Sequence, residues 1–282
     1  RRAYLKKAAI APFDGICSGD ITVIEADPDK ILPELLPFII QNDDLFDFAV
    51  GKSAGSLSPR VKWEHLKNYA FELPDMDKQK ELAELLWAID DTKKSYQKLI
   101  TATDELVKSQ FMEQFKELIN SPEACSKIED ECTVFADGDW IESKDQSDEG
   151  IRLIQTGNIG NAQYLDKGER ARYITEDTFN RLNCTEVKAN DILISRLPDP
   201  VGRACIIPEG LGKCITAVDC TIVRLRSRIL PEYFIAYTLS PFYMMQVAAR
   251  ETGSTRKRIS RKNLGILKIP VPQIAEQESF AS

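Results

Sequence analysis

Residues 75–120 read "DMDKQKELAELLWAIDDTKKSYQKLITATDELVKSQFMEQFKELIN" and contain no Pro or Gly. Apolar positions recur three and four residues apart, which is the a/d pattern of a coiled coil. At 1.5 Å per residue, about 45 residues make a rod of roughly 65 Å, and one apolar seam in water needs a partner helix. The sequence therefore predicts a long coiled-coil spacer helix, packed through Leu82, Leu85, Ile89, Tyr96, Leu99 and Leu106.

The composition indicates two domains of ordinary size in addition to this helix. The chain has 282 residues, of which 43% are hydrophobic and 29% charged, enough to form packed cores. No apolar run approaches membrane length and no signal-peptide core follows Arg1, so we expect a cytoplasmic protein without a membrane partner. Seven cysteines without a C-x-x-C pair and one histidine, His65, predict reduced thiols and no metal site.

Charge is distributed unevenly along the chain. The net charge of −7 by itself argues against a nucleic-acid partner. Residues 151–272, however, carry 19 basic and 11 acidic side chains, a net of +8, whereas residues 121–150 carry 2 and 10, a net of −8. A basic surface is more often only solvated, but here the basic residues concentrate in one loop, which favours DNA.

The segment before the long helix, residues 1–74, is predicted to be the C-terminal part of a first domain. Two short apolar runs, "DITVIEA" (20–26) and "YAFEL" (69–73), flank a helical stretch from Leu32 to about Val50.

Three segments follow the helix. Residues 121–150 are acidic and irregular, which predicts an exposed connection. Residues 151–272 alternate strand and helix patterns, which predicts a complete second domain and the fold class α+β. Residues 273–282 read as the start of a second spacer helix.

The end of the chain is similar to its beginning at an offset of 198 residues. Eleven of the 53 ungapped pairs between residues 31–83 and 229–281 are identical, among them I-L-P-E, a Gly-Ser turn and single Pro and Gln positions. Shared turns and helix starts predict an internal repeat with a period near 198. Two full periods exceed this sequence, so we expect it to be truncated at both ends, with a second rod as the missing partner helix.

The loop "GSTRKRISRK" (253–262) is the main candidate for DNA binding. Cations and hydroxyls at a Gly-led turn are typical phosphate ligands, although a solvated basic loop is an equally good interpretation. Its counterpart in the repeat, "GSLSPRVKW" (55–63), keeps the turn and two cations. The candidates are Ser254, Thr255, Arg256, Lys257, Arg258, Ser260, Arg261 and Lys262, and in the first copy Ser56, Arg60 and Lys62.

The segment "IQTGNIG" (154–160) supplies candidates for base reading. Gln155, Thr156 and Asn158 follow a strand pattern, and amide side chains can pair bidentately with adenine. A tight turn capped by its own side chain is at least as good an interpretation. In "ANDILISR" (189–196), only Arg196 is predicted to contact DNA.

Sequence patterns of catalysis are missing. The chain has no G-x-x-x-x-G-K-[ST] loop and no Gly-rich dinucleotide turn. We interpret His65 as structural and expect no catalytic residue.

Taken together, these motifs resemble the specificity subunit of type I restriction–modification systems. The resemblance rests on "IRLIQTGNIG", "VKANDILISR", "LPEYFIAYTLSP", "GSTRKRISRKNLGILKIPVPQIAEQ" and "LPDMDKQKELAELLWAID". It implies target recognition domains that read a bipartite site in double-stranded DNA, held apart by spacer helices. It also implies adenine methyltransferase (modification) subunits and ATP-dependent restriction subunits as partners, with S-adenosylmethionine, ATP and Mg²⁺ bound to those partners rather than to this chain.

Two other functions stay open from the sequence. One is a recognition fragment of a fused restriction–methylation enzyme. The other is an assembly-only or silent specificity cassette.

Overall fold

The structure, a computed structural model, describes residues 1–281 and has an α+β fold. It divides into two compact units, Arg1–Ile100 and Thr101–Ser282, and the division falls within one long helix. Each unit is described by itself below.

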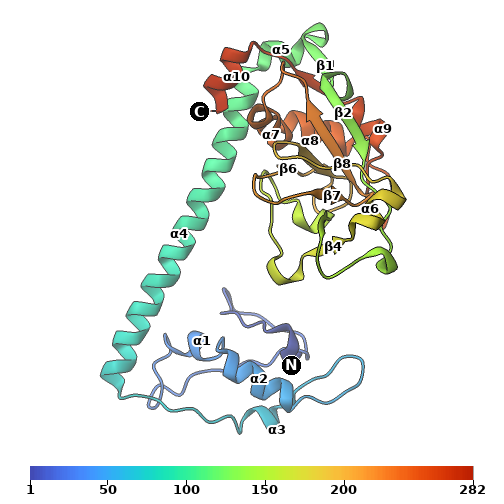
Figure 1. Ribbon diagram of the computed structural model, residues 1–282. Coiled ribbons are helices and arrows are strands. Elements are labelled where there is room, and N and C mark those ends of the chain that lie inside the picture. Colours follow the sequence, from blue (N-terminus) through green and yellow to red (C-terminus); the bar gives the residue numbers. More distant parts are fainter. Residues whose placement is uncertain (282) are drawn as a thin grey trace. The chain divides into compact units, whose positions relative to one another are not determined.

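The long helix is α4, Met76–Gln114 (Figure 1). Asp75 caps its start, where Oδ1 accepts a hydrogen bond from the backbone N–H of Lys78 at 3.0 Å. Helical geometry stops at Phe115 (φ −105°, ψ 15°), and α5, Lys116–Asn120, follows. The uninterrupted helix has 39 residues and is therefore about 58 Å long.

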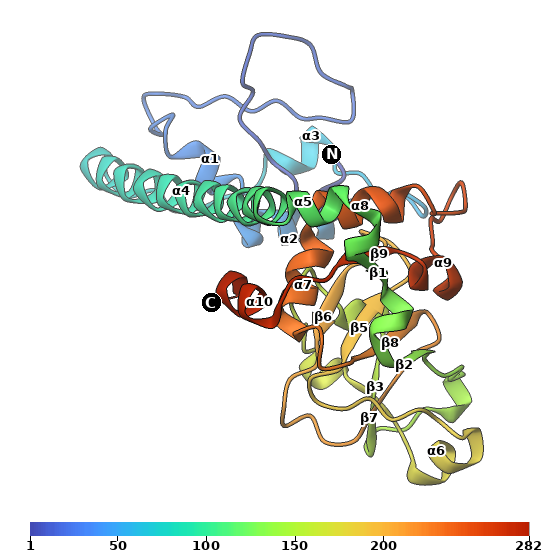
Figure 2. The same cartoon turned by 90° about the horizontal axis from the view of Figure 1, so that it is seen from above.

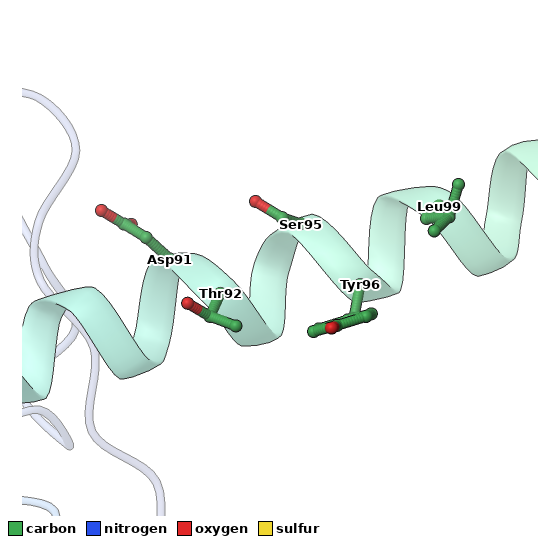
Figure 3. A pocket seen from close by; sticks show the side chains of 5 residues that line it. All are labelled: Asp91, Thr92, Ser95, Tyr96 and Leu99. Carbon is green, nitrogen blue, oxygen red and sulfur yellow. The ribbon is translucent and has the colours of Figure 1, made fainter.

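The predicted seam of α4 lies on its surface. Its six members are between 43% and 64% exposed: Leu82, Leu85, Ile89, Tyr96, Leu99 and Leu106. Figure 3 shows Tyr96 and Leu99 beside Asp91, Thr92 and Ser95 around a shallow depression lined by this helix alone. A depression built by one helix is an open surface and not a ligand cavity.

The N-terminal unit consists of short helices joined by long irregular segments. Helices α1, α2 and α3 span Leu36–Ile39, Asp43–Gly51 and Trp63–Leu66, so the predicted helical stretch is present in two pieces. Neither predicted apolar run, 20–26 or 69–73, forms a strand. Ala3, Ala49 and Val61 form a small buried cluster.

The strands of the structure lie in the C-terminal unit, in three antiparallel or mixed sheets. A four-stranded sheet has the order β2-β8-β5-β6, a three-stranded sheet the order β4-β3-β7, and β1 pairs with β9 (Figures 1 and 2). The strands are β1 Cys125–Lys127, β2 Cys132–Asp137, β3 Ile151–Ile154, β4 Arg172–Ile174, β5 Ile192–Ser195, β6 Ala204–Ile206, β7 Cys214–Thr216, β8 Cys220–Leu225 and β9 Lys268–Pro270.

Helices of the C-terminal unit bury an aromatic core. Phe111, in the last turn of α4, and Phe115, just after it, contact each other and Tyr233. Phe111 also contacts Phe280, and the ring centroids of these four pairs are 5.0 to 5.7 Å apart. The aromatic side chains that follow Pro231 therefore belong to the hydrophobic core. The helices of this unit after α5 are α6 Glu176–Leu182, α7 Pro231–Leu239, α8 Pro241–Ala248, α9 Arg261–Gly265 and α10 Ile274–Ala281.

Residues 121–150 are not the exposed connection that their acidity predicts. They contain β1 and β2, and β2 forms one edge of the four-stranded sheet, where it pairs with β8. Ile128 and Cys132 are buried in the main core. The acidic residues Glu129, Asp130 and Glu131 lie between these two apolar residues in a 3-10 helix, and Glu131 is itself buried and paired with Arg228, so a high net charge did not prevent burial of the segment. Short 3-10 helices occur at Ala3–Leu5, Pro122–Ala124, Ile128–Glu131, Ser143–Asp145, Thr156–Asn158 and Gly168–Arg170.

A buried glutamine lies in the first turn of α4 and another in the first turn of α10, and the two make the same three hydrogen bonds. Gln277 accepts from the N–H of Leu230 and donates to the carbonyls of Arg228 and Pro272, at 2.8 to 2.9 Å. In the N-terminal unit, Gln79 bonds to the corresponding groups at 2.9 to 3.2 Å: Leu32 N–H, Lys30 O and Pro74 O. Every partner is offset by 198 residues, for example 277 − 79. We name this arrangement the glutamine clasp.

Candidate nucleic-acid interface

Three loops that are far apart in the sequence are joined by hydrogen bonds in the C-terminal unit. They are residues 155–163 after β3, residues 196–203 between β5 and β6, and residues 252–262 leading into α9. The backbone N–H of Ile259 donates to the carbonyl of Arg196 at 3.1 Å. Arg203 donates to the carbonyls of Thr156 and Ile159 at 2.8 and 2.6 Å. We call these segments the three-loop surface.

The basic loop is a tight hairpin. Thr252 and Arg258 exchange two backbone hydrogen bonds of 2.8 and 2.9 Å. Gly253 turns the chain at φ +97°, and a Cβ there would lie 2.5 Å from the carbonyl oxygen of Arg256, so only glycine fits. The turn exposes all of its polar side chains: Ser254, Thr255, Arg256, Lys257 and Arg258.

Three of the eight predicted side chains in this loop, those of Lys257, Ser260 and Arg261, already have partners within the chain. Lys257 pairs with Glu251 at 3.0 Å. Arg261 donates to Asp137 at 3.2 Å and to the carbonyl of Phe135 at 3.0 Å. The hydroxyl of Ser260 caps α9, and the carbonyl of Arg258 accepts from the threonine at the base of the hairpin.

The guanidinium groups of Arg256 and Arg258 and the amine of Lys262 have no side-chain hydrogen bond or ion pair to any described residue. All three side chains are exposed. Cations without an acidic partner are available to bind phosphate.

Arg196 is held inside the three-loop surface. Its guanidinium donates to the carbonyl of Val218, and its Nε lies 3.4 Å from Asp137 Oδ1. Only 16% of the side chain is exposed. Asp137 thus lies between two predicted DNA ligands, Arg196 and Arg261. The structure argues against a direct DNA contact by Arg196, because its donors are directed into the domain.

The turn after β3 uses two of its three predicted base-reading residues to form itself. Asn158 is buried; its Oδ1 accepts from the N–H of Gln155 at 3.0 Å and its Nδ2 donates to the carbonyl of Leu165 at 3.0 Å. The side chain of Gln155 completes a reciprocal cap with Asn158. This geometry argues against base reading by Asn158, and it supports the alternative of a self-capped turn. Thr156 stays half-exposed.

Other side chains of the same loop are better placed than those predicted. Asn161 and Gln163 are exposed and make no side-chain hydrogen bond to a described residue. Ala162 between them adopts φ +58° and its N–H donates to the carbonyl of Ala204 at 2.9 Å, which fixes the turn. The amine of Lys167 lies beside Gly157. Sequence gave no signal for these residues, because polar side chains in a turn usually indicate only a turn.

The corresponding hairpin of the N-terminal unit has the same backbone but a different charge balance. Ala54 and Arg60 exchange hydrogen bonds of 3.1 and 2.9 Å around Gly55 at φ +120°. Arg60 donates twice to Asp20, at 2.7 and 3.1 Å, and these bonds lower the pKa of that carboxyl. Ser56 and Lys62 are exposed.

The described residues show neither a metal centre nor a membrane span. Within residues 1–281, His, Cys, Asp and Glu side chains form no group of three or more that could hold a metal ion. In the same part of the chain, every helix is too short or too polar to cross a bilayer.

Comparison with known proteins identifies the family. Residues 124–282, more than half of the chain, match the type I restriction modification DNA specificity domain. The chain belongs to this family. The matched region contains the whole three-loop surface.

Individual relatives are distant. The MjaVIII specificity subunit of a type I restriction enzyme from Methanocaldococcus jannaschii is 20% identical over 253 residues. This alignment covers 83% of our chain but 59% of the relative, so the chain spans less than two thirds of that subunit.

One solved structure shares the fold. A chain from work on complex assembly and conformational transition of the type I R-M system aligns over 99% of our chain and 70% of its own, with 19% identity and a TM-score of 0.50. The HsdS subunit from Thermoanaerobacter tengcongensis aligns over 92% and 63%, with 17% identity and a TM-score of 0.43.

Proposed function

We propose that this chain is a DNA sequence-recognition part of a type I specificity subunit, with residues 121–272 as a target recognition domain for double-stranded DNA. One observation carries the proposal. A chain of net charge −7 presents Arg256, Arg258 and Lys262 without acidic partners on a surface that three sequence-distant loops build together. Phosphate contacts by such cations would position the domain, and polar side chains of the neighbouring loops would read base edges.

Residues 1–74 would belong to a second recognition domain, related to the first by an internal repeat of about 198 residues. The glutamine clasp supports this repeat, since all four positions keep the offset. Further support comes from the hairpins Ala54/Arg60 and Thr252/Arg258 and from the helix starts at Met76 and Ile274, which keep it as well. Two related domains would read the two halves of a bipartite site.

Helix α4 would be the spacer between the two recognition domains. Its exposed apolar seam would pack against a second long helix, of which α10 would be the first turns. A helix of about 58 Å approaches the length of two turns of B-DNA at about 34 Å each, which suits two half-sites separated by unspecified base pairs.

The chain itself would be non-catalytic. Adenine methyltransferase subunits would act on DNA that this subunit positions, and ATP-dependent restriction subunits would complete the assembly. S-adenosylmethionine, ATP and Mg²⁺ would be bound by those partners. Family membership supports this division of labour.

A binding selection tests the proposal directly. The purified chain, with and without a methyltransferase subunit, is incubated with a randomised duplex library at two salt concentrations. We expect enrichment of a short sequence, with an affinity that falls as salt rises because bound phosphates release counterions. Salt-sensitive binding without enrichment would contradict sequence recognition, and binding that ignores salt would contradict the role of the cations.

A further inference from the structure

Arg203 makes an unusual set of contacts at the centre of the three-loop surface. Its guanidinium donates four hydrogen bonds, all to backbone carbonyls. Nε donates to Ile159 O at 2.6 Å and Nη2 to Thr156 O at 2.8 Å. Nη1 donates to Leu197 O at 2.8 Å and to Pro200 O at 3.0 Å. One side chain thus joins the turn after β3 to the loop between β5 and β6.

This arginine has no carboxylate within ion-pair distance among residues 1–281. Burial lowers its pKa from the ordinary value, as expected when a cation is removed from water. Arg203 is half-buried, and another half-buried arginine of the domain is paired: Arg224 donates to both oxygens of Asp191 at 2.7 Å. Removing a charge from water without a counterion is unfavourable, so packing alone does not explain why an arginine makes these contacts.

The geometry of the guanidinium supplies that explanation. The group is planar and presents its donors in a fixed fork, so four carbonyls bound to it are held in fixed relative positions. Because it uses only backbone oxygens, the side chains of the two loops stay available: Thr156, Asn161, Gln163 and Asp199 are exposed or half-exposed. Base reading requires side chains to be placed within a few tenths of an ångström, which loops achieve only when neighbouring groups hold them.

A second set of contacts fixes the backbone next to this arginine. The hydroxyl of Tyr243 donates to the carbonyl of Gly202 at 2.8 Å. Gly202 adopts φ +85°, and a Cβ there would meet that hydroxyl at 2.9 Å. The backbone here continues the β5–β6 pair, since Ser195 N–H donates to the carbonyl of Arg203 at 2.9 Å and Gly202 N–H donates to the carbonyl of Ser195 at 2.8 Å. The fork therefore extends from a rigid base toward two loops that protrude.

We propose that Arg203 is a positioning residue that couples the 155–163 loop to the 197–200 loop, and that sequence discrimination depends on it while phosphate affinity does not. The inference rests on the proposed DNA recognition. It assigns to an inward-directed arginine the role of arranging the reading loops, and leaves phosphate binding to the exposed cations of the 252–262 loop.

The test compares Arg203→Lys with Arg224→Lys in the full chain. The probes are the duplex enriched from the randomised library and the same duplex with one base pair replaced. Lysine keeps the charge but loses the fork, so we expect Arg203→Lys to lose at least tenfold in the affinity ratio of the two duplexes. The salt dependence should be unchanged. Arg224→Lys, which disturbs a fork elsewhere in the domain, should keep the ratio.

Two further measurements separate positioning from general stability. Hydrogen exchange in peptides covering residues 155–163 should increase in Arg203→Lys and not in Arg224→Lys. A second variant, Arg203→Gln, should lose discrimination in the same way.

Several outcomes would overturn the inference. The first is that Arg224→Lys loses as much discrimination between the two duplexes as Arg203→Lys does, at an equal decrease of the thermal midpoint. The second is a salt slope reduced by about one in Arg203→Gln, which would make Arg203 a phosphate ligand. The third is failure of both Arg203 variants to fold. A wild-type chain that binds both duplexes equally would instead refute the proposed function, and the inference with it.

Discussion

Residues 31–79 and 229–277 build the same local structures in different surroundings. Both have a glutamine clasp, a glycine hairpin and a short helix after the hairpin. In the C-terminal unit the strand before the clasp, β8, is buried between β2 and β5. The matching run in the N-terminal unit forms no strand, and Ile21 and Val23 are 55% and 67% exposed.

This difference separates two kinds of structure. The hairpin joins residues six positions apart, and every partner of a clasp glutamine lies within 49 positions of it, so both arrangements form in either segment without β2 or its neighbours. A strand needs hydrogen bonds and apolar cover from segments far away in the sequence. In the C-terminal unit β2 precedes β8 by roughly 90 residues, and its register is set by that pairing.

The aromatic core is a feature of the C-terminal unit. Phe111 is fully buried between Tyr233 and Phe280. We expect Phe111→Ala to lower the free energy of unfolding of the C-terminal unit by about 3–5 kcal/mol, because it removes a large core side chain and leaves a cavity. Urea denaturation, monitored by hydrogen exchange of residues 101–281, measures this change in the free energy of unfolding.

The control for this variant lies on the same helix. Leu106 is 56% exposed, and Leu106→Ala should change that free energy by less than about 0.5 kcal/mol. Similar losses in both variants would show that α4 is stabilised by its seam rather than by its aromatic end.

Variants of the two clasp glutamines test whether the clasp contributes equally to stability in residues 31–79 and in residues 229–277. Gln277→Leu and Gln79→Leu each leave one N–H and two carbonyls without a partner, which should cost about 2–3 kcal/mol. Hydrogen exchange at the amide of Leu230 should increase only in the first variant, and at Leu32 only in the second. Gln273→Leu, at an exposed position of the same turn, should change neither. An effect in one copy only would contradict their equivalence.

The two hairpins should differ in DNA binding. Arg256→Ala with Arg258→Ala removes two cations without ion-pair partners, so the salt slope should fall by about two and the affinity at roughly 0.1 M salt by about 10- to 100-fold. Arg60→Ala should have a smaller effect, because its guanidinium is already bound by Asp20. Fluorescence anisotropy measures the affinity for DNA. Equal losses of affinity would show that the ion pair between Arg60 and Asp20 does not limit DNA binding by the first hairpin.

Thiol reactivity gives the smallest effect and the simplest measurement. Cys17 is exposed, whereas the cysteines of the C-terminal unit are buried, and burial raises the pKa of Cys132 and Cys205 to about 12. A thiolate is the reactive form. We expect one fast-reacting thiol per chain in labelling with a disulfide reagent at pH 8, absent in Cys17→Ser. A second fast thiol would indicate local opening of the C-terminal unit.

Periodicity predicted the elements whose stabilising contacts are local. The long helix lies where its pattern indicates, and residues 151–272 contain strands and helices in alternation, as their patterns predict. The prediction for the acidic segment was wrong because its charge conceals the pairing of β1 with β9 and of β2 with β8, which joins it to residues far along the chain.

The candidate site shows the same limit. The basic hairpin could be found from residue types, because exposed cations in a loop need no partner to be recognised. The roles of Asn158, Arg196 and Arg203 could not, because an amide or a guanidinium serves equally well inside a turn and toward a ligand. Their hydrogen bonds in the structure settle which: Asn158 bonds within its own turn, whereas Arg196 and Arg203 bond to carbonyls of other segments.

Residue types and their spacing predicted the long helix and the basic hairpin, since each depends on contacts within one short segment. The glutamine clasp, the meeting of three loops, the burial of the acidic segment and the inward direction of Arg196 and Arg203 were set by tertiary packing. Such contacts join residues as distant in the chain as Cys125 and Pro270 of the β1–β9 pair, and no local pattern records which of many polar groups will be neighbours once the core has formed.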